Sequence, residues 1–192
     1  IILCCRLMDR EAYAWQGDWY RQQVKKHLGN WTDDNMRIWY TEHALHGDHH
    51  EELDDPMHAV PYNGVLQQAL RDVALWVEKG IEPPQSTAYQ IQDAQVVVPA
   101  TANERKGIQP VVRLTITGDD KQGVLSHEGK RIDTRKGAAV DFSAHVEIPE
   151  GTGQLVSVEW SFDGKTYTRG ELDASYAFPK KPGTYFVTCR VA

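Results

Sequence analysis

The spacing of apolar residues changes at Pro83 and Pro84, and this change limits what the chain can fold into. Before the prolines, short apolar runs alternate with segments whose apolar residues recur every three or four positions, which predicts strands and amphipathic helices. From Val111 onward apolar and polar residues alternate between turns rich in Gly, Asp and Pro, which predicts an antiparallel sandwich. We therefore expect an α/β domain over residues 1–81, an extended connector over 82–109 and an all-β domain over 110–192.

Two strands and two helices are predicted in the first domain. Residues 1–7 are apolar except for Arg6, as in a strand that is buried on both faces of a parallel sheet, and a second strand spans 36–42. Helices are expected over about 15–28 and 64–79, because each carries an apolar stripe. The residues of these two stripes are Tyr20, Val24 and Leu28, and Leu66, Leu70, Val73 and Val77. The order strand, helix, strand predicts a right-handed crossover and parallel strands.

A carboxylate and two histidines follow the two predicted strands. Asp9 comes after the first strand, and His43 and His46 come after the second, in MRIWYTEHALHGD at residues 36–48. Gly47 stands beside His46 and allows the backbone to approach a substrate closely. An imidazole paired with a carboxylate is the acid–base part of a catalytic triad, so the two segments suggest two of its three members.

These segments resemble the α/β-hydrolase family. IILCCRLMDREAYAW is similar to its seventh strand and acid loop, MRIWYTEHALHGD to its eighth strand and histidine loop, and residues 64–79 to its last helix. The segments DWYR, WYTEHALHGD and WVEKG resemble a bacterial group of large α/β-hydrolase-domain proteins. The resemblance implies the C-terminal portion of an α/β-hydrolase sheet with helices, carboxylic ester hydrolase activity of the serine type on a small ester, and no cofactor.

By this resemblance Asp9 is the acid that orients the catalytic histidine. Alignment of the strand ends places His46 and Gly47 on the His-Gly of the family, so His46 is the preferred base. His43 directly follows the strand and is the alternative base; otherwise it braces the loop.

The nucleophile of such a triad is not evident in the sequence. Every serine follows the two histidines, and none lies in a G-x-S-x-G motif between a strand and a helix. In the family the serine precedes the acid, so we expect it in an upstream part of the hydrolase or in a companion chain. The start at Ile1, without a methionine, is what we expect of the later part of a longer or processed protein. The predicted two-stranded sheet would then have one open apolar edge.

A metal site is a weaker alternative for the histidine loop. Asp48, His49 and His50 are potential ligands of zinc or another transition ion. The loop lacks an H-E-x-x-H motif and paired cysteines, so a solvated polar loop is the preferred interpretation.

Charge and hydropathy exclude two classes of partner. The net charge of −6 and the lack of a basic run argue against binding to nucleic acid. Arg6 interrupts the longest apolar stretch, so no membrane span is predicted.

The second domain resembles a PKD-type immunoglobulin-like module. EWSFDGKTY is similar to the W-x-F-G-D-G core of that module, without its first glycine, and ASYAFPKKPGTYFVTCRVA is similar to its last two strands. Trp160 and Phe162 are expected on one side of a strand together with Val156 and Val158. Such modules serve as spacers or adhesion units in exported enzymes, so the resemblance implies a secreted, periplasmic or cell-surface protein.

Two functions follow from the sequence. The first is a serine hydrolase to which this chain supplies the acid and the histidine. The second is a non-catalytic binding or structural module whose immunoglobulin-like domain contacts a protein or a glycan.

Overall fold

The chain was analysed as a computed structural model that describes residues 1–47, 58–118, 124–125, 131–135, 137–179 and 181–192. The contacts divide it into two compact units. Unit 1 comprises Ile1–Gln109 and Ile148–Gly153, and unit 2 comprises Pro110–Glu147 and Gln154–Ala192.

Unit 1 is built around one pair of parallel strands. β1 (Ile2–Arg6) pairs with β2 (Arg37–Thr41) so that Cys5 lies opposite Tyr40, which confirms the predicted parallel pairing. The connection from β1 to β2 contains a long helix and two single turns. The helices of unit 1 are α1 (Ala14–Leu28), η1 (Gly29–Trp31), α2 (Thr32–Asn35), α3 (Asn63–Lys79) and α4 (Ala102–Arg105).

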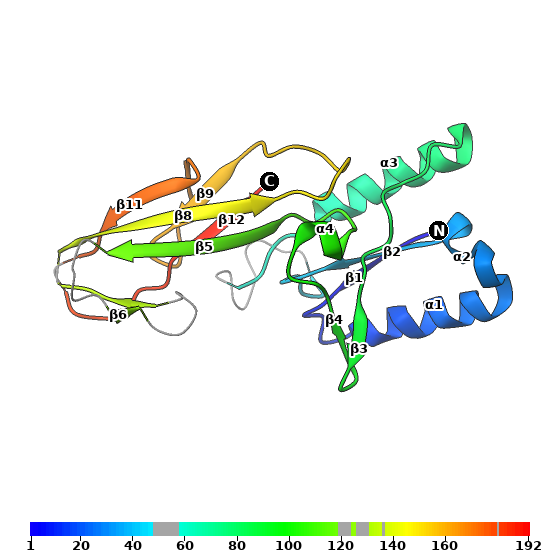
Figure 1. Ribbon diagram of the computed structural model, residues 1–192, viewed down its shortest axis with the longest axis horizontal. Helices are drawn as coiled ribbons and strands as arrows, with labels where there is room; N and C mark the ends of the chain where they lie inside the picture. The colour runs from blue at the N-terminus through cyan, green and yellow to red at the C-terminus, as the bar shows by residue number, and fades with distance from the viewer. Residues whose placement is uncertain (48–57, 119–123, 126–130, 136, 180) are drawn as a thin grey trace. The chain divides into compact units, whose positions relative to one another are not determined.

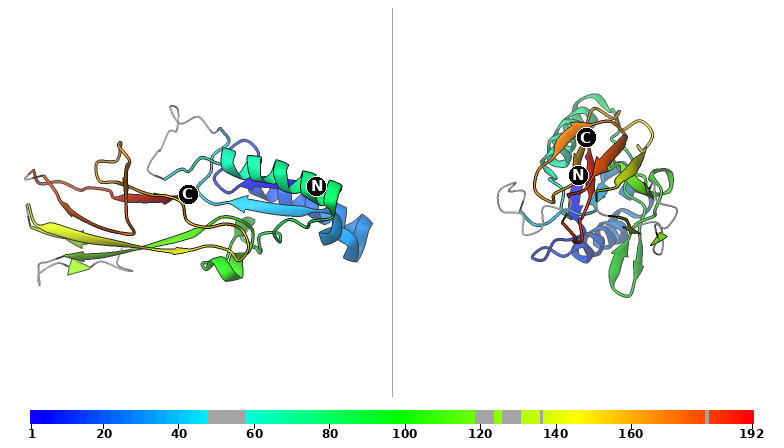
Figure 2. Two further views of the ribbon diagram at one scale, coloured as in Figure 1. Left: turned by 90° about the horizontal axis from the view of Figure 1, so that it is seen from above. Right: turned by 90° about the vertical axis from the view of Figure 1, so that its left-hand side faces the viewer.

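Helices α1 and α3 lie on opposite faces of the strand pair (Figures 1 and 2). On one face, a Cβ atom added to Gly17 of α1 would lie 2.4 Å from Cys5 Sγ and 3.3 Å from Ile38 Cδ1. On the other face, the Arg37 guanidinium lies 4.7 Å from the ring centroid of Trp76 in α3. Alternate residues of a strand point to opposite faces, so each helix covers one set of side chains.

The buried face of α3 differs from the predicted one. Leu70 and Val77 are 70% and 80% exposed, whereas Ala69 and Asp72 are buried. Apolar residues occur on more than one side of this helix, so periodicity did not identify the side that packs against β1.

The outer edge of β2 is closed by the chain that follows the two prolines. The Ile38 N–H donates to Ser86 Oγ at 3.1 Å, and the Tyr40 N–H donates to Thr87 Oγ1 at 3.1 Å. The Thr87 N–H donates in turn to the Ile38 carbonyl at 2.9 Å. Hydroxyl groups thus take the place of a third strand and satisfy the backbone of β2.

The residues that follow form a hairpin and a short helix. β3 (Gln90–Gln92) and β4 (Gln95–Val97) pair in antiparallel fashion through Asp93 and Ala94, whose φ angles of 49° and 60° suit a two-residue hairpin turn. Helix α4 was not predicted, although Thr101 caps its start: the Glu104 N–H donates to Thr101 Oγ1 at 3.3 Å.

Unit 2 contains two three-stranded antiparallel sheets, with strand orders β10-β9-β12 and β11-β8-β5. Their buried core includes Val140, Phe142 and Ala144 from β8 and Val158 and Trp160 from β9. The strands are β5 (Val111–Gly118), β6 (Val124–Leu125), β7 (Ile132–Asp133), β8 (Ala139–Glu147), β9 (Val158–Ser161), β10 (Thr168–Gly170), β11 (Asp173–Ala177) and β12 (Thr188–Val191).

Several aromatic side chains of unit 2 pack against one another around this core. Phe162 stacks on Tyr176 with a centroid separation of 4.2 Å, and on Trp160 with a separation of 6.0 Å. Val156 was predicted on the same buried side, but it is 60% exposed and precedes β9.

The predicted fold class is wrong. We expected a C-terminal portion of an α/β-hydrolase sheet with helices, followed by an immunoglobulin-like sandwich. The described strands instead form five small sheets, of which four are antiparallel and β1–β2 is the one parallel pair. Strand patterns in a sequence do not specify strand partners, and here hydroxyl groups of residues 86–87 occupy the edge of β2 where a wider sheet would continue.

Replacement of Gly17 by alanine tests the packing of α1. We expect Gly17→Ala to lower the free energy of unfolding by about 1–3 kcal/mol, because the added methyl group overlaps Cys5 Sγ. Gly64→Ala in α3 is the matched control, since no atom lies within 4 Å of the added Cβ atom. Urea titrations measure both, and equal stabilities of the two variants would contradict this packing.

Candidate active site

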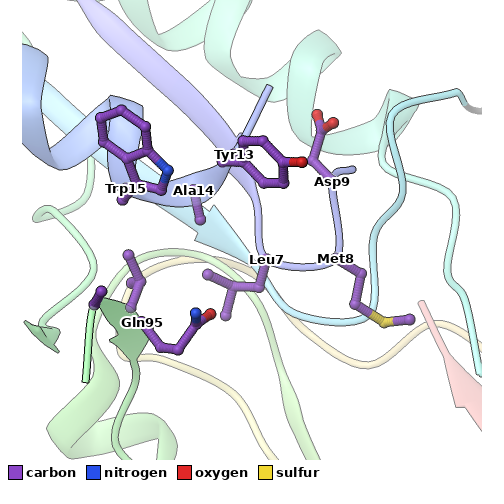
Figure 3. A pocket seen from close by; sticks show the side chains of 9 residues that line it. Leu7, Met8, Asp9, Tyr13, Ala14, Trp15 and Gln95 are labelled. Atoms are coloured by element: carbon purple, nitrogen blue, oxygen red, sulfur yellow. The ribbon is translucent and has the colours of Figure 1, made fainter. Parts of the chain in front are cut away.

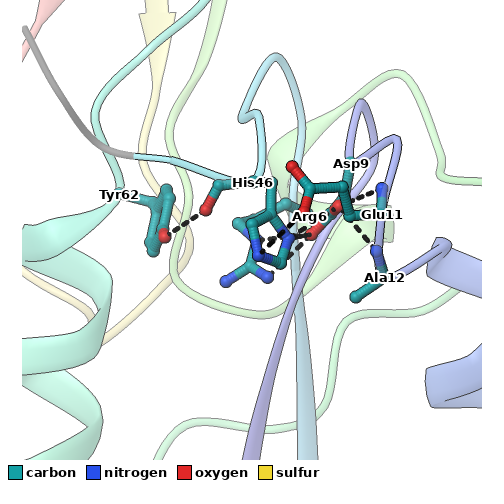
Figure 4. A network of polar contacts seen from close by, with 6 residues as sticks. All are labelled: Arg6, Asp9, Glu11, Ala12, His46 and Tyr62. Atoms are coloured by element: carbon teal, nitrogen blue, oxygen red, sulfur yellow. Dashed lines mark hydrogen bonds and ion pairs between the residues drawn. The ribbon is translucent and has the colours of Figure 1, made fainter.

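The centre of the site is the buried carboxylate of Asp9, in the loop between β1 and α1. Its side chain has no exposed surface and accepts hydrogen bonds from several directions (Figure 4). The N–H groups of Glu11 and Ala12 donate to Oδ1 at 2.9 and 2.8 Å, and Arg6 Nε and Nη2 donate to Oδ2 at 3.0 and 2.7 Å. The carboxylate is therefore held in one orientation by its own loop and by the end of β1.

His46 completes this arrangement from the loop that follows β2. Its Nδ1 lies 3.0 Å from both Asp9 oxygens. An ionised carboxylate only accepts hydrogen bonds, so Nδ1 carries a proton, and in the neutral ring Nε2 then keeps its lone pair. His46 in this state is a hydrogen-bond acceptor and a base at Nε2, and 45% of its side chain is exposed.

Backbone contacts beyond the strands hold the two loops together. The Leu7 N–H donates to the Thr41 carbonyl at 2.9 Å, and the Met8 N–H donates to the Ala44 carbonyl at 3.1 Å. These bonds continue the β1–β2 pairing past both strand ends and bring Asp9 beside His46. The site therefore lies at the carboxyl ends of two parallel strands, where functional loops of such sheets gather.

Tyr62 fixes the backbone of His46 from the start of α3. Its hydroxyl group donates to the His46 carbonyl oxygen at 2.7 Å, and its ring lies 4.7 Å from the guanidinium carbon of Arg6. Arg6 thus contacts both Asp9 and Tyr62. Neither Arg6 nor Tyr62 was expected in the site, and the spacing of Arg6 and Asp9, three positions apart, is the only local signal in the sequence.

His43, the alternative base, has a different environment. Its φ angle is 60°, and its Nδ1 lies 3.1 Å from the His58 carbonyl oxygen. Its own carbonyl accepts the Val60 N–H at 2.8 Å. The structure brings His46 to Asp9 and places His43 in a contact that joins two parts of the loop.

The pKa of Asp9 is lowered to about 2 by the groups around it. Burial disfavours the charged form and acts in the opposite direction, but it is outweighed by the backbone N–H groups of Ala12 and Glu11 and by the side chains of Arg6 and His46. Asp9 is therefore ionised throughout the neutral range and can stabilise a protonated imidazole.

Glu11 is the neighbour of the outward-facing nitrogen of His46. Its Oε2 lies 3.8 Å from Nε2, and 73% of its side chain is exposed. Because the side chain is so exposed, a change of rotamer can clear the space in front of Nε2 for another reactant.

The cysteines do not provide a thiolate near neutral pH. Burial raises the pKa of Cys4 and Cys189 to about 11 and that of Cys5 to about 12. A thiol attacks as its anion, so these side chains are poor nucleophiles.

Ser86, the only serine in the sequence of unit 1, is held at the edge of β2 by the Ile38 N–H. Within the described residues, no hydrogen bond is recorded between His46 and a serine.

The alternative metal ligands Asp48, His49 and His50 lie outside the described residues. Elsewhere, in the part of the chain that the structure describes, no group of three or more His, Cys, Asp or Glu residues is arranged to hold a metal ion. None of the described helices is long and apolar enough to cross a membrane.

Comparison of the chain with protein-family models, curated proteins and solved structures found no match. The functional argument therefore depends on the geometry of Asp9 and His46.

The low pKa of Asp9 predicts a loss of stability in acid. Its folded-state pKa of about 2 is below the ordinary value of 3.8, so ionised Asp9 stabilises the fold above about pH 4, and this contribution is lost as the pH falls toward 2. The contribution is on the order of 2 kcal/mol. Urea unfolding of Asp9→Asn between pH 5 and pH 2 should show a flatter pH dependence than the wild type.

Asp34→Asn is the control for this measurement. Asp34 is exposed, and no hydrogen bond or ion pair of its side chain is recorded in the described structure. It should retain the wild-type dependence on pH. A wild-type slope in Asp9→Asn would show that Asp9 does not carry the effect.

Proposed function

We propose that this chain supplies the acid and the base of a serine hydrolase that acts on small carboxylic esters. The observation that carries the proposal is the contact between the buried Asp9 carboxylate and Nδ1 of His46, which leaves Nε2 available to accept a proton. The likeness of both loops to the acid and histidine loops of α/β-hydrolases supports ester chemistry. The proposal concerns this chemistry, not the expected hydrolase sheet.

In the proposed reaction His46 moves protons and Asp9 holds it in the required tautomer. A serine hydroxyl group attacks the carbonyl carbon of the ester while His46 Nε2 takes its proton. Asp9 stabilises the resulting imidazolium, which then protonates the departing alkoxide as the carbon–oxygen bond breaks. Water, deprotonated by the same nitrogen, hydrolyses the acyl-serine and regenerates the serine.

We infer that the serine comes from another polypeptide segment, either an upstream part of the hydrolase or a companion chain. β1 pairs with β2 on one side, and no strand partner is recorded on its other side within the described residues. An open strand edge binds an added strand through backbone hydrogen bonds. Asp9 follows the carboxyl end of this strand, so such a segment would come close to the site.

Unit 2 has a separate role in this proposal. Its likeness to PKD-type modules supports a spacer in a secreted, periplasmic or cell-surface enzyme. Its core packing supplies the rigidity that a spacer needs, since Phe142, Trp160 and Phe162 lie in mutual aromatic contact.

Hydrolysis of p-nitrophenyl acetate by the isolated chain tests the base directly. An oriented imidazole attacks this activated ester without a serine, so we expect slow release of p-nitrophenol. His46→Gln should reduce the protein-dependent rate by about tenfold or more, because it removes the attacking imidazole. His43→Gln is the matched control and should retain the rate. Equal rates in both variants would contradict the role of His46.

Labelling with a fluorophosphonate probe tests where the serine lies. The isolated chain should remain unlabelled, because Ser86 accepts the Ile38 N–H in a structural contact. In the native preparation, a larger polypeptide that contains this sequence, or one that copurifies with it, should be labelled. Absence of label there, together with inert p-nitrophenyl esters, would favour the non-catalytic binding or structural module.

A further inference from the structure

A hollow of about 410 Å³ lies in unit 1 beside the loop that carries Asp9. It is formed by the segment that connects β1 to α1, by the first turn of α1 and by the β3–β4 hairpin (Figure 3). Its lining includes Leu7, Met8, Tyr13, Trp15, Gln95 and Val96. We propose that this hollow is a binding site for a small, neutral aromatic molecule.

Two aromatic residues of the lining, Tyr13 and Trp15, suit an aromatic ligand. Tyr13 and Trp15 are 53% and 49% exposed, although both are large rings at the start of a helix. Each ring therefore keeps about half of its surface uncovered beside a hollow whose volume is within the usual range of small-molecule sites. Stacking or edge contacts with a bound ring would raise the affinity about two- to tenfold beyond the gain from burial.

The polar groups of the lining define the charge of the ligand. No Lys, Arg or His is among the residues that line the hollow. Asp9 is among the lining residues, but its carboxylate has no exposed surface, so it presents no charge to a ligand. The same carboxylate already accepts hydrogen bonds from Arg6, His46 and two backbone N–H groups, so it is a poor partner for a cation.

Three neutral side chains of the lining can hydrogen-bond to a ligand, and the Tyr13 hydroxyl group, which donates and accepts, is one of them. The Trp15 indole N–H is a donor, and the Gln95 amide both donates and accepts. Both side chains border the hollow in Figure 3, on the α1 side and the hairpin side respectively. An aromatic ring with one hydroxyl group, such as a naphthol, matches this combination of aromatic walls and neutral polar groups.

The site is distinct from the nitrogen that the proposed hydrolase uses. His46 is not among the lining residues, and its Nε2 faces Glu11 instead. Binding in the hollow and proton transfer at His46 can therefore be tested independently, and the failure of one proposal leaves the other standing.

Saturation-transfer NMR titrations of the full chain with 2-naphthol test this site. We expect wild-type binding, at least fivefold weaker binding by Trp15→Ala, and binding within twofold of the wild type by Trp19→Ala. Trp19 is the matched control, because it is a 58% exposed tryptophan on the same helix that does not line the hollow. No binding by the wild type, or equal losses in the two variants, would overturn the proposal.

The saturated analogue decahydro-2-naphthol tests the aromatic character of the ligand. It has the same skeleton and hydroxyl group but no π-face, so we expect it to bind about two- to tenfold more weakly than 2-naphthol. Equal affinities would overturn the assignment to an aromatic ligand.

A second pair of variants keeps the test independent of helix stability. Gln95→Trp fills the hollow from the hairpin and should abolish 2-naphthol binding. Gln90→Trp adds the same side chain to the same hairpin, opposite Val97 and outside the lining, and should leave binding intact. Unchanged binding by Gln95→Trp would show that the ligand binds elsewhere.

Discussion

The arrangement of the site depends on one buried charge, the carboxylate of Asp9. A carboxylate without exposed surface is costly unless every oxygen has donors, and here the two oxygens are bonded by Arg6, His46 and two backbone N–H groups. Two of the donors come from the loop after β1, one comes from the end of β1 and one comes from the loop after β2. Satisfying this charge therefore joins the loops that follow the two strands.

The same requirement accounts for the orientation of His46. The Asp9 carboxylate accepts a hydrogen bond from His46 Nδ1, and the Tyr62 hydroxyl group donates to the carbonyl oxygen of His46. Both constraints act together, so the imidazole is held by its ring and by its backbone. A histidine with a fixed tautomer and an outward-facing Nε2 is what acid–base chemistry at this nitrogen requires. Acid–base chemistry also requires a reactant next to His46 Nε2, where the Glu11 carboxylate lies in this structure.

The local elements of unit 1 could be predicted from the sequence, whereas several of their partners could not. Ile1–Leu7 and Met36–Glu42 have strand patterns, and their parallel pairing followed from the helix between them. The fold class was wrong because apolar patterns do not reveal which edges pair: the hydroxyl groups of Ser86 and Thr87 close β2 from a distant, polar part of the chain. In α3, apolar residues occur on several sides of the helix, so the sequence pattern did not indicate that the side with Asp72 is buried.

The residues of the candidate site also differ in whether the sequence alone could reveal them. Asp9 and His46 could be predicted to lie near each other because each follows a strand of one parallel pair. Arg6, Glu11 and Tyr62 could not, since each contributes through contacts that only the folded backbone creates. The need for a glycine at position 17 could not be predicted either, because it arises from the position of Cys5 beneath α1 in the folded chain.

The central claim is that Asp9 holds His46 with its proton on Nδ1. A long-range ¹H–¹⁵N NMR spectrum of the imidazole nitrogens, recorded where the ring is neutral, identifies which nitrogen carries the proton. We predict the Nδ1–H form for His46 in the wild type and a loss of this preference in Asp9→Asn, because the amide no longer requires a donor. An Nε2–H form, or a mixture of tautomers in the wild type, would contradict the account.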